Sequence, residues 1–194
     1  MLSAIFCKFE VSKLPINHRN SRMISKFQKI SPYTFNEKLF QIIDKEWFLI
    51  TAGQPSSMNT MTASWGGFGI LWNKPVCFIF VRPTRFTYNF LEENERFTMS
   101  FFSKEYKKTL SFLGTISGKN LDKIGESGLT LVSIDNLSFA FEESRLIFDC
   151  KKIYYNDLLP QNFLDSEIGL NYKANDYHRM YIGEIVNIFE KLIV

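Results

Sequence analysis

The chain has 194 residues, of which 45% are hydrophobic and 22% are charged. That length corresponds to one domain and that apolar fraction can form a core, so disordered, collagen-like and coiled-coil classes are excluded. The net charge is +3, but residues 1–30 carry six basic residues against one acidic residue, while the remainder carries 17 basic and 19 acidic ones. The basic excess thus lies in the N-terminal residues, and we expect no nucleic-acid binding by the domain.

The N-terminal residues differ from the rest of the chain. Residues 1–22 are predicted to be an extension outside the fold, and residues 23–194 to form the domain. The Ser, Arg and Lys content of the extension is typical of an organelle targeting segment, and an extension upstream of a start at Met23 is an equally open alternative. No apolar run reaches the roughly 18 residues of a membrane helix, so we expect a soluble protein without a membrane partner.

From residue 47 onward, short elements are separated by Gly and Pro. Residues 47–51 predict a strand that ends in turn chemistry at residues 52–55. Further strands are predicted over residues 76–81, 96–102, 137–141, 145–155 and 177–192. Helical spacing predicts helices over residues 84–94, with Thr84 as the N-cap, over 104–113 and, as one short turn, over 121–126. This pattern indicates a β-barrel decorated by a few helices.

The cysteines do not form a metal-binding pattern. Cys7, Cys77 and Cys150 lie far apart in the sequence, so we expect neither a zinc site nor an iron–sulfur cluster. Cys77 and Cys150 fall within predicted strands, where a small buried hydrophobe is the favoured interpretation. An odd and sparse count is typical of a reducing cytosol, which predicts a cytoplasmic location.

Known catalytic motifs do not fit the chain. Residues 114–119 (GTISGK) resemble a phosphate-binding Walker loop, but the glycines are one residue too close and Asn120 replaces the hydroxyl that binds magnesium. We interpret this near match as chance. His18 and His178 are the only histidines in the sequence, so there are few candidates for a Ser-His or Cys-His nucleophile pair. The catalytic residues therefore stay unknown.

Residues 56–102 carry unusual chemistry. In residues 57–66, small hydroxyl and amide side chains alternate with Met and Trp, so an extended strand would separate polar donors from apolar groups. Arg82, Arg85 and two threonines surround the start of the predicted helix, where backbone N–H groups and guanidinium donors make a phosphate cradle. A phosphate site beside a surface for a planar ring describes a mononucleotide-type cofactor.

At these residues the sequence resembles the flavin reductase-like family of FMN-binding split barrels, which includes flavoredoxins. The matching stretches are residues 59–66 (NTMTASWG), 72–75 (WNKP), 81–87 (VRPTRFT), 97–102 (FTMSFF), 118–130 (GKNLDKIGESGLT) and 181–185 (YIGEI). The resemblance implies a mainly β fold, a six-stranded antiparallel Greek-key split barrel with a few short helices. It also implies a homodimer with FMN near the interface, and a flavin oxidoreductase that accepts hydride from NAD(P)H and passes electrons to an acceptor.

The resemblance further implies which residues bind FMN. They are Asn59, Met61, Thr62, Ala63, Ser64, Trp65, Arg82, Arg85, Thr87, Phe102, Lys123 and His178. Asn59, residues 61–64 and Trp65 would line the ring and ribityl side, and the two arginines with Thr87 would hold the phosphate. Lys123 belongs to the family's Asp-Lys motif, whose cation favours the anionic reduced flavin, and Phe102 would stack on or shield the ring.

Plain alternatives stand beside these assignments. They are core positions for Trp65 and Phe102, ion pairs of the two arginines with Glu92 or Glu95, a solvated pair of Lys123 with Asp122, and a structural role for His178. A buried Asn59 would need hydrogen-bond partners in either case. Two other functions also stay open: an electron carrier that binds FMN without an NAD(P)H site, and a non-redox binding module that has lost the cofactor.

Overall fold

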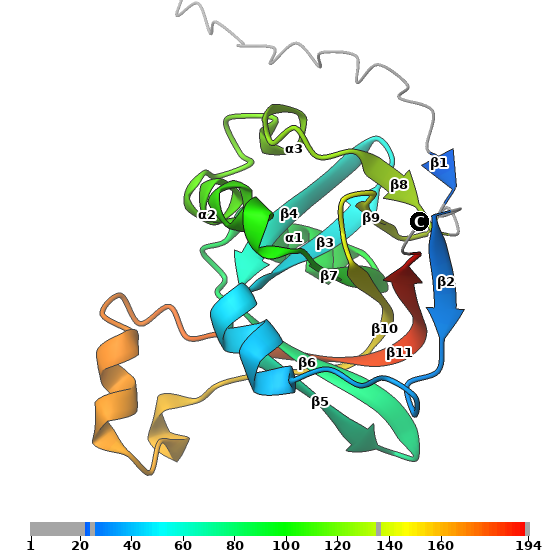
Figure 1. The fold of residues 1–194 in the computed structure, drawn as a ribbon. Helices are drawn as coiled ribbons and strands as arrows, with labels where there is room; N and C mark the ends of the chain where they lie inside the picture. Colours follow the sequence, from blue (N-terminus) through cyan, green and yellow to red (C-terminus); the bar gives the residue numbers. More distant parts are fainter. Residues whose placement is uncertain (1–21, 24–25, 135–136, 193–194) are drawn as a thin grey trace, which may run out of the picture.

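The computed structural model describes residues 22–23, 26–134 and 137–192 (Figure 1). The predicted extension of residues 1–22 lies outside the described residues apart from Arg22, as do Cys7 and His18. The strands are β1 (Arg22–Met23), β2 (Phe27–Ile30), β3 (Phe48–Gln54), β4 (Ser57–Ala63), β5 (Gly66–Leu71), β6 (Lys74–Val81), β7 (Arg96–Phe101), β8 (Leu131–Ser133), β9 (Phe139–Phe141), β10 (Leu146–Asp157) and β11 (Arg179–Lys191). The helices are α1 (Phe86–Glu93), α2 (Lys107–Thr115), α3 (Lys123–Glu126), the π-helix η1 (Gln41–Glu46), and the 3₁₀ helices η2 (Lys104–Tyr106), η3 (Pro160–Asn162) and η4 (Ser166–Asn171).

The main sheet is antiparallel throughout. Its strands follow the order β4-β3-β7-β10-β11-β6-β5, and β2 pairs with β11 beside this path. Strands β1, β8 and β9 form a small second sheet. Figure 1 shows the main sheet curling around a central core, with α1 and α2 beside β4. The mainly β prediction with a few short helices is confirmed, but the strand count exceeds the predicted six.

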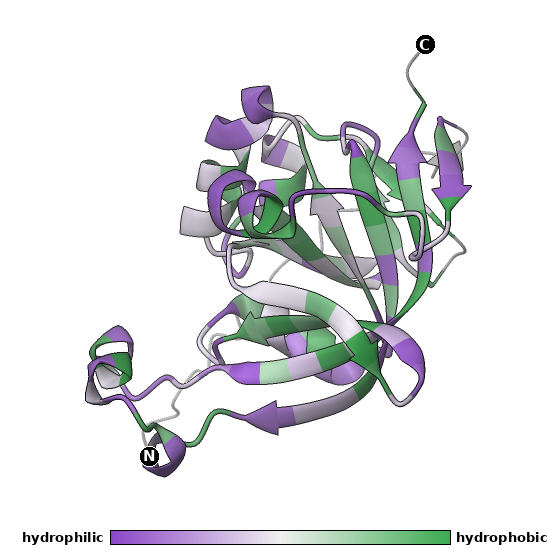
Figure 2. Cartoon of the chain, turned by 60° about the horizontal axis from the view of Figure 1, so that its bottom comes forward, coloured by the Kyte–Doolittle hydropathy of each residue, from purple (hydrophilic) through white to green (hydrophobic). Residues whose placement is uncertain are grey.

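The core lies inside the curled sheet. Phe48 and Ile50 of β3 belong to the main buried cluster, whereas Leu49 between them belongs to a second cluster with Leu110 and Leu113 of α2. Because β3 is buried on both faces, it is encoded as a continuous apolar run rather than as an alternating one. Burial of each such side chain contributes about 1.5–3 kcal/mol. Figure 2 shows hydrophobic residues gathered on the strands, while the helices carry hydrophilic stretches.

Two local predictions need correction. Strand β3 continues through the predicted turn at residues 52–55 as far as Gln54, which pairs with Ser57, so the hairpin turn is Pro55-Ser56. Gly53 permits this with a φ of 126°, and a Cβ there would lie 2.4 Å from the Ser57 carbonyl oxygen. The N-cap of α1 is Arg85 rather than Thr84, because Arg85 still has extended backbone angles and the helix begins at the next residue.

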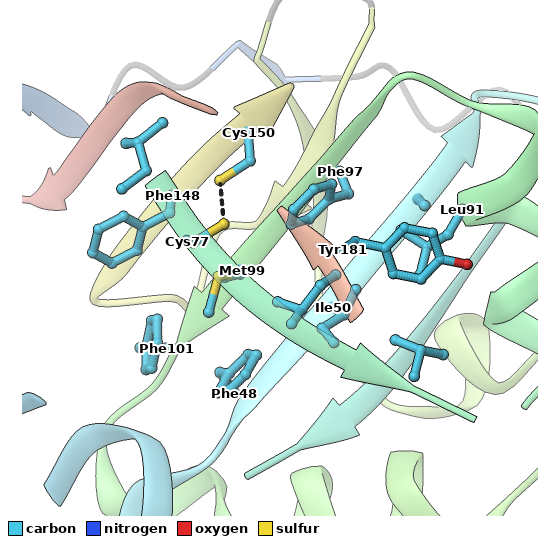
Figure 3. Close-up of a cluster of buried hydrophobic side chains, with 14 of the residues drawn as sticks. Phe48, Ile50, Cys77, Leu91, Phe97, Met99, Phe101, Phe148, Cys150 and Tyr181 are labelled. Carbon is cyan, nitrogen blue, oxygen red and sulfur yellow. Dashed lines mark hydrogen bonds between the residues drawn. The ribbon is translucent and has the colours of Figure 1, made fainter. Parts of the chain in front are cut away.

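Cys77 and Cys150 are fully buried, as predicted. Their Sγ atoms lie 3.4 Å apart inside the barrel (Figure 3). Burial raises the pKa of the Cys150 thiol well above its ordinary value, which keeps the group protonated. Among the described residues, no cluster of three or more His, Cys, Asp or Glu side chains could hold a metal ion. Within the same ranges, no helix has both the length and the apolar character needed to cross a membrane.

Candidate functional site

Asn59 links strand β4 to the start of helix α1. Its side chain is buried, and Nδ2 donates a hydrogen bond of 2.8 Å to Oγ1 of Thr87, which is buried in the first turn of α1. Within the described part of the chain no hydrogen bond is made to Asn59 Oδ1, so this acceptor is available to a ligand. The strand and the helix start that the sequence assigned to one cofactor therefore lie side by side.

The loop after α2 closes over this pair. A Cβ at Gly118 would lie 2.3 Å from Asn59 Oδ1, so the backbone approaches the amide as closely as a glycine allows. Nη1 of Arg85 donates to the Gly114 carbonyl at 3.2 Å, and this is its only side-chain hydrogen bond to a described residue. The segment that resembled a Walker loop thus lies at the site. That near match was the sequence signal for Gly114 and Gly118, which the prediction missed.

Lys123 is buried beneath the same loop. Its Nζ donates to the carbonyl oxygens of Leu113, at 2.9 Å, and Ile116, at 3.1 Å, at the end of α2. Burial, helped by the nearby charge of Arg85, lowers the pKa of Lys123 to about 8. The neighbouring Asp122 caps α3 instead, accepting a bond from the Gly125 amide at 3.0 Å. The alternative of a solvated Lys123–Asp122 pair is therefore wrong.

The side chains of β4 alternate differently from the prediction. One face carries Asn59, Met61 and Ala63, and the other carries Thr60 and Thr62. Met61 is buried in the main core, and Ala63 packs against that core. Oγ1 of Thr62 donates to the Leu110 carbonyl of α2. Asn59 is thus the buried polar residue of a face whose other polar member, Ser57, is exposed, while the partly exposed Ser64 follows the end of the strand.

Arg82 has a different set of partners from Arg85. Its Nη1 lies 2.8 Å from both carboxylate oxygens of Asp176, and its Nη2 donates to the Asn171 carbonyl at 2.8 Å. The predicted alternative partners are engaged elsewhere, since Glu92 binds Arg179 and Glu95 binds Lys151. Sequence reasoning missed Asp176, because an ion pair across 94 residues leaves no local pattern.

His178 and Trp65 lie next to each other. Their ring centroids are 5.0 Å apart, and the Tyr172 hydroxyl lies 2.9 Å from His178 Nδ1. Trp65 is 45% exposed, so the alternative that it is a core residue is wrong. Burial, together with the charges of Arg82 and Arg85 and against that of Asp176, lowers the pKa of the buried His178 to about 4. The imidazole is therefore neutral at physiological pH.

This neutral histidine makes folding stability depend on pH. Between pH 6.5 and 4 the unfolded chain binds a proton at His178 that the folded chain excludes, so stability falls as the pH falls. We expect the loss to reach about 3 kcal/mol at pH 4. Urea unfolding of the wild type and of His178→Gln from pH 4 to 7 measures it as the difference between the two curves. Parallel curves would contradict the buried neutral imidazole.

Phe102 is a core residue. It is buried in the second cluster, with its ring 5.7 Å from that of Tyr106 and 6.2 Å from that of Phe141. It also lines a cavity of about 580 Å³ between η1 and the start of α2, to which Lys107 and Leu110 contribute. The alternative of a core position for Phe102 is therefore the one that its surroundings favour.

Comparisons with known proteins agree with this architecture. The structure of flavoredoxin from Methanosarcina acetivorans matches with a TM-score of 0.61 and 20% identity over 86% of this chain and 78% of that one. An FMN-binding domain of a flavin reductase-like enzyme from Shewanella baltica matches with a TM-score of 0.62 and 14% identity, over 85% and 77% of the two chains. A putative flavin reductase with a split barrel domain from Shewanella frigidimarina matches with a TM-score of 0.59 and 18% identity, over 82% and 74%. At these identities the likeness establishes the split-barrel fold.

A search of curated proteins finds no match. The family model described as "Flavin reductase like domain" matches residues 43–192, which include every predicted site residue. This match spans most of the chain and nearly all of its main sheet. The chain therefore belongs to the flavin reductase-like domain family.

Proposed function

We propose that the protein is an FMN-binding oxidoreductase that takes electrons from NAD(P)H and passes them to an acceptor. One observation carries the proposal: Asn59, Thr87 and Arg85 converge with Gly118 and Lys123 between β4, α1 and the end of α2. The place combines cationic and N–H donors with an amide acceptor that no hydrogen bond from a described residue engages, as a phosphorylated planar heterocycle requires. Membership of the flavin reductase-like family supports the same cofactor class.

The residues fit the two ends of FMN. Arg85 has guanidinium donors to spare, and α1 begins at the next residue, so Arg85, Thr87 and the first N–H groups of the helix would hold the phosphate. Asn59 and the exposed Trp65 would meet the remainder of the molecule from the two ends of β4. When bound, FMN supplies the redox chemistry of the site.

Lys123 would act through its charge. The carbonyl oxygens of Leu113 and Ile116 use two of its three N–H donors and hold the ammonium group in place. With a pKa of about 8, Lys123 is mostly protonated at neutral pH. A fixed cation beside the ring favours the reduced cofactor, which carries more negative charge.

The absorbance spectrum of the purified protein tests the proposal, followed by titration with NADH and NADPH without air. A flavin spectrum that bleaches with either nucleotide supports the proposed activity. A flavin that stays oxidised would favour an electron carrier that receives electrons from another protein. That second candidate is supported by the fold shared with a flavoredoxin. A protein that neither contains nor binds FMN would favour a non-redox binding module.

The proposal includes a homodimer and a cytoplasmic location. Large apolar side chains are exposed near β5, namely those of Trp65, Ile70, Trp72 and Tyr154, and a second copy would cover such a surface. The free thiols of Cys77 and Cys150 suit a reducing compartment. Light scattering after gel filtration tests the dimer.

The close approach of Gly118 to Asn59 gives a further prediction. In Gly118→Ala the new methyl group would displace the Asn59 side chain, which Thr87 holds in place. Losing one hydrogen bond to the cofactor would weaken FMN binding by about tenfold. Gly169→Ala is the matched control, since nothing lies within 4 Å of a Cβ at that position. Fluorescence titration with FMN measures both variants, and equal affinities would contradict the role of this contact.

A further inference from the structure

The β10–β11 connection is a folded unit of its own. Residues 158–178, which we call the strap, leave the sheet where Asp157 pairs with Arg179 and project away from the barrel (Figure 1, orange). Aromatic rings fill the strap: the Phe163 and Tyr172 centroids are 5.9 Å apart, and those of Tyr172 and Tyr177 are 4.9 Å apart. The strap therefore has packing of its own, which can hold the side chains at its base in a fixed geometry.

Arg82 ties the strap to the barrel. It contributes the two-atom contact with Asp176 and the bond to the Asn171 carbonyl, and its guanidinium lies 5.2 Å from the Tyr172 ring centroid. Planar, two-atom contacts of this kind are directional, and Lys cannot reproduce them. Arg82 lies only three residues before Arg85, yet all three contacts belong to the strap. The two arginines therefore have different partners: Arg82 contacts the strap, and Arg85 contacts the Gly114 carbonyl.

The ring of His178 has one nitrogen, Nε2, that is available to a ligand. The Tyr172 hydroxyl occupies Nδ1, and within the described part of the chain nothing bonds Nε2, which belongs to the ring packed against Trp65. Burial raises the pKa of the Tyr172 phenol, so the phenol keeps its proton and can donate it to Nδ1. The guanidinium over the Tyr172 ring makes that phenol a better donor. Donation to Nδ1 leaves the imidazole proton on Nε2.

We propose that Arg82 and Tyr172 are positioning residues, which hold His178 as a neutral donor whose Nε2–H bonds the flavin. The inference rests on the proposed function. It replaces the assignment of Arg82 to the phosphate that the resemblance implied. Arg85 remains the phosphate ligand, while Arg82 acts on the cofactor only through Tyr172 and His178.

Nitrogen NMR of the imidazole tests this proposal directly. The chain has two histidines, so His18→Gln leaves His178 as the only ring signal. In this parent we expect the Nε2–H form at pH 6 and a shift of the Nε2 signal when FMN is added. Tyr172→Phe should give a mixture of the two His178 tautomers. Arg82→Lys should raise the titration midpoint of His178 toward its ordinary value, because the contacts of Arg82 with the strap are lost. Both changes should weaken FMN binding by about tenfold, the effect of one hydrogen bond.

The Arg82→Lys variant separates the directional contacts of Arg82 with the strap from its charge, because Lys keeps the charge and loses those contacts. Facing His178 are the charges of Arg82, Arg85 and Asp176, together with the Tyr172 hydroxyl. If Arg82 acted only as a charge, Lys would keep the parent's His178 midpoint and FMN affinity, and that result would overturn the proposal. An Nδ1–H form in the parent would overturn the role of Tyr172. A parent that binds FMN with no change at His178 overturns this inference alone, whereas a parent that binds no FMN overturns the proposed function as well.

Discussion

Arg85→Met is expected to weaken FMN binding on the order of 100-fold, the effect of losing charge-assisted hydrogen bonds worth about 1.5–3 kcal/mol. Arg85 stands at the N-cap of α1, and its guanidinium makes one hydrogen bond to a described residue, the Gly114 carbonyl, so its remaining side-chain donors are available to an anion. Its side chain is not part of the hydrophobic core, and the variant should fold. Fluorescence titration with FMN and with riboflavin, which lacks the phosphate, measures the effect.

Two comparisons make the Arg85 prediction specific. Lys108→Met removes the same charge from the exposed side of α2, and its FMN affinity should match that of the wild type. The Arg85 variant should bind riboflavin as well as the wild type does, because only the phosphate contact is lost. An equal loss for FMN and riboflavin would mean that Arg85 shapes the site without contacting phosphate. Unchanged FMN binding would mean that the phosphate binds at a place other than Arg85.

The sequence predicted the long elements of the fold because their patterns are local. Helix α1 and strands β6, β7, β10 and β11 follow from apolar runs or regular spacing within one segment. Strands β1, β2 and β8 have only two to four residues each, and they exist because distant partners pair with them. Such pairings are set by the tertiary fold and carry no periodicity of their own.

The candidate site shows the same division. The sequence singled out Asn59, Thr87 and Arg85 from local chemistry, and the fold brings them together at the start of α1. It could not assign the partners of Arg82 or Lys123, because these depend on how the strap and the end of α2 pack. Residue type indicated a functional segment, while the tasks of individual residues followed from three-dimensional contacts.

The largest stability effect is expected away from this site, at Asp149. Its carboxylate is fully buried on β10 and accepts bonds from Ser138 and Asn187, each at 2.8 Å, and from Arg96 of β7. Since Asn187 belongs to β11, one carboxylate joins three adjacent strands of the main sheet. A buried ion pair whose partner is removed leaves the other charge without compensation, which is more costly than the pair itself is stabilising.

Asp149→Ala should therefore lower the free energy of unfolding by about 3–5 kcal/mol, out of a total of about 5–15 kcal/mol for a typical domain. The matched control is Lys151→Ala on the same strand, whose pair with Glu95 is exposed and spans 3.8 Å, so the expected change is within about 0.5 kcal/mol. Urea unfolding at pH 7 measures both variants, and a double variant with Arg96→Met should lose less than the sum of the single changes because no charge is left buried alone. Equal unfolding midpoints for Asp149→Ala and Lys151→Ala would contradict the role of the network. Because the hydrogen-bond partners of Asp149, namely Arg96, Ser138 and Asn187, do not belong to the candidate site, folded Asp149→Ala should bind FMN as the wild type does. This result would separate the scaffold from the chemistry that it supports.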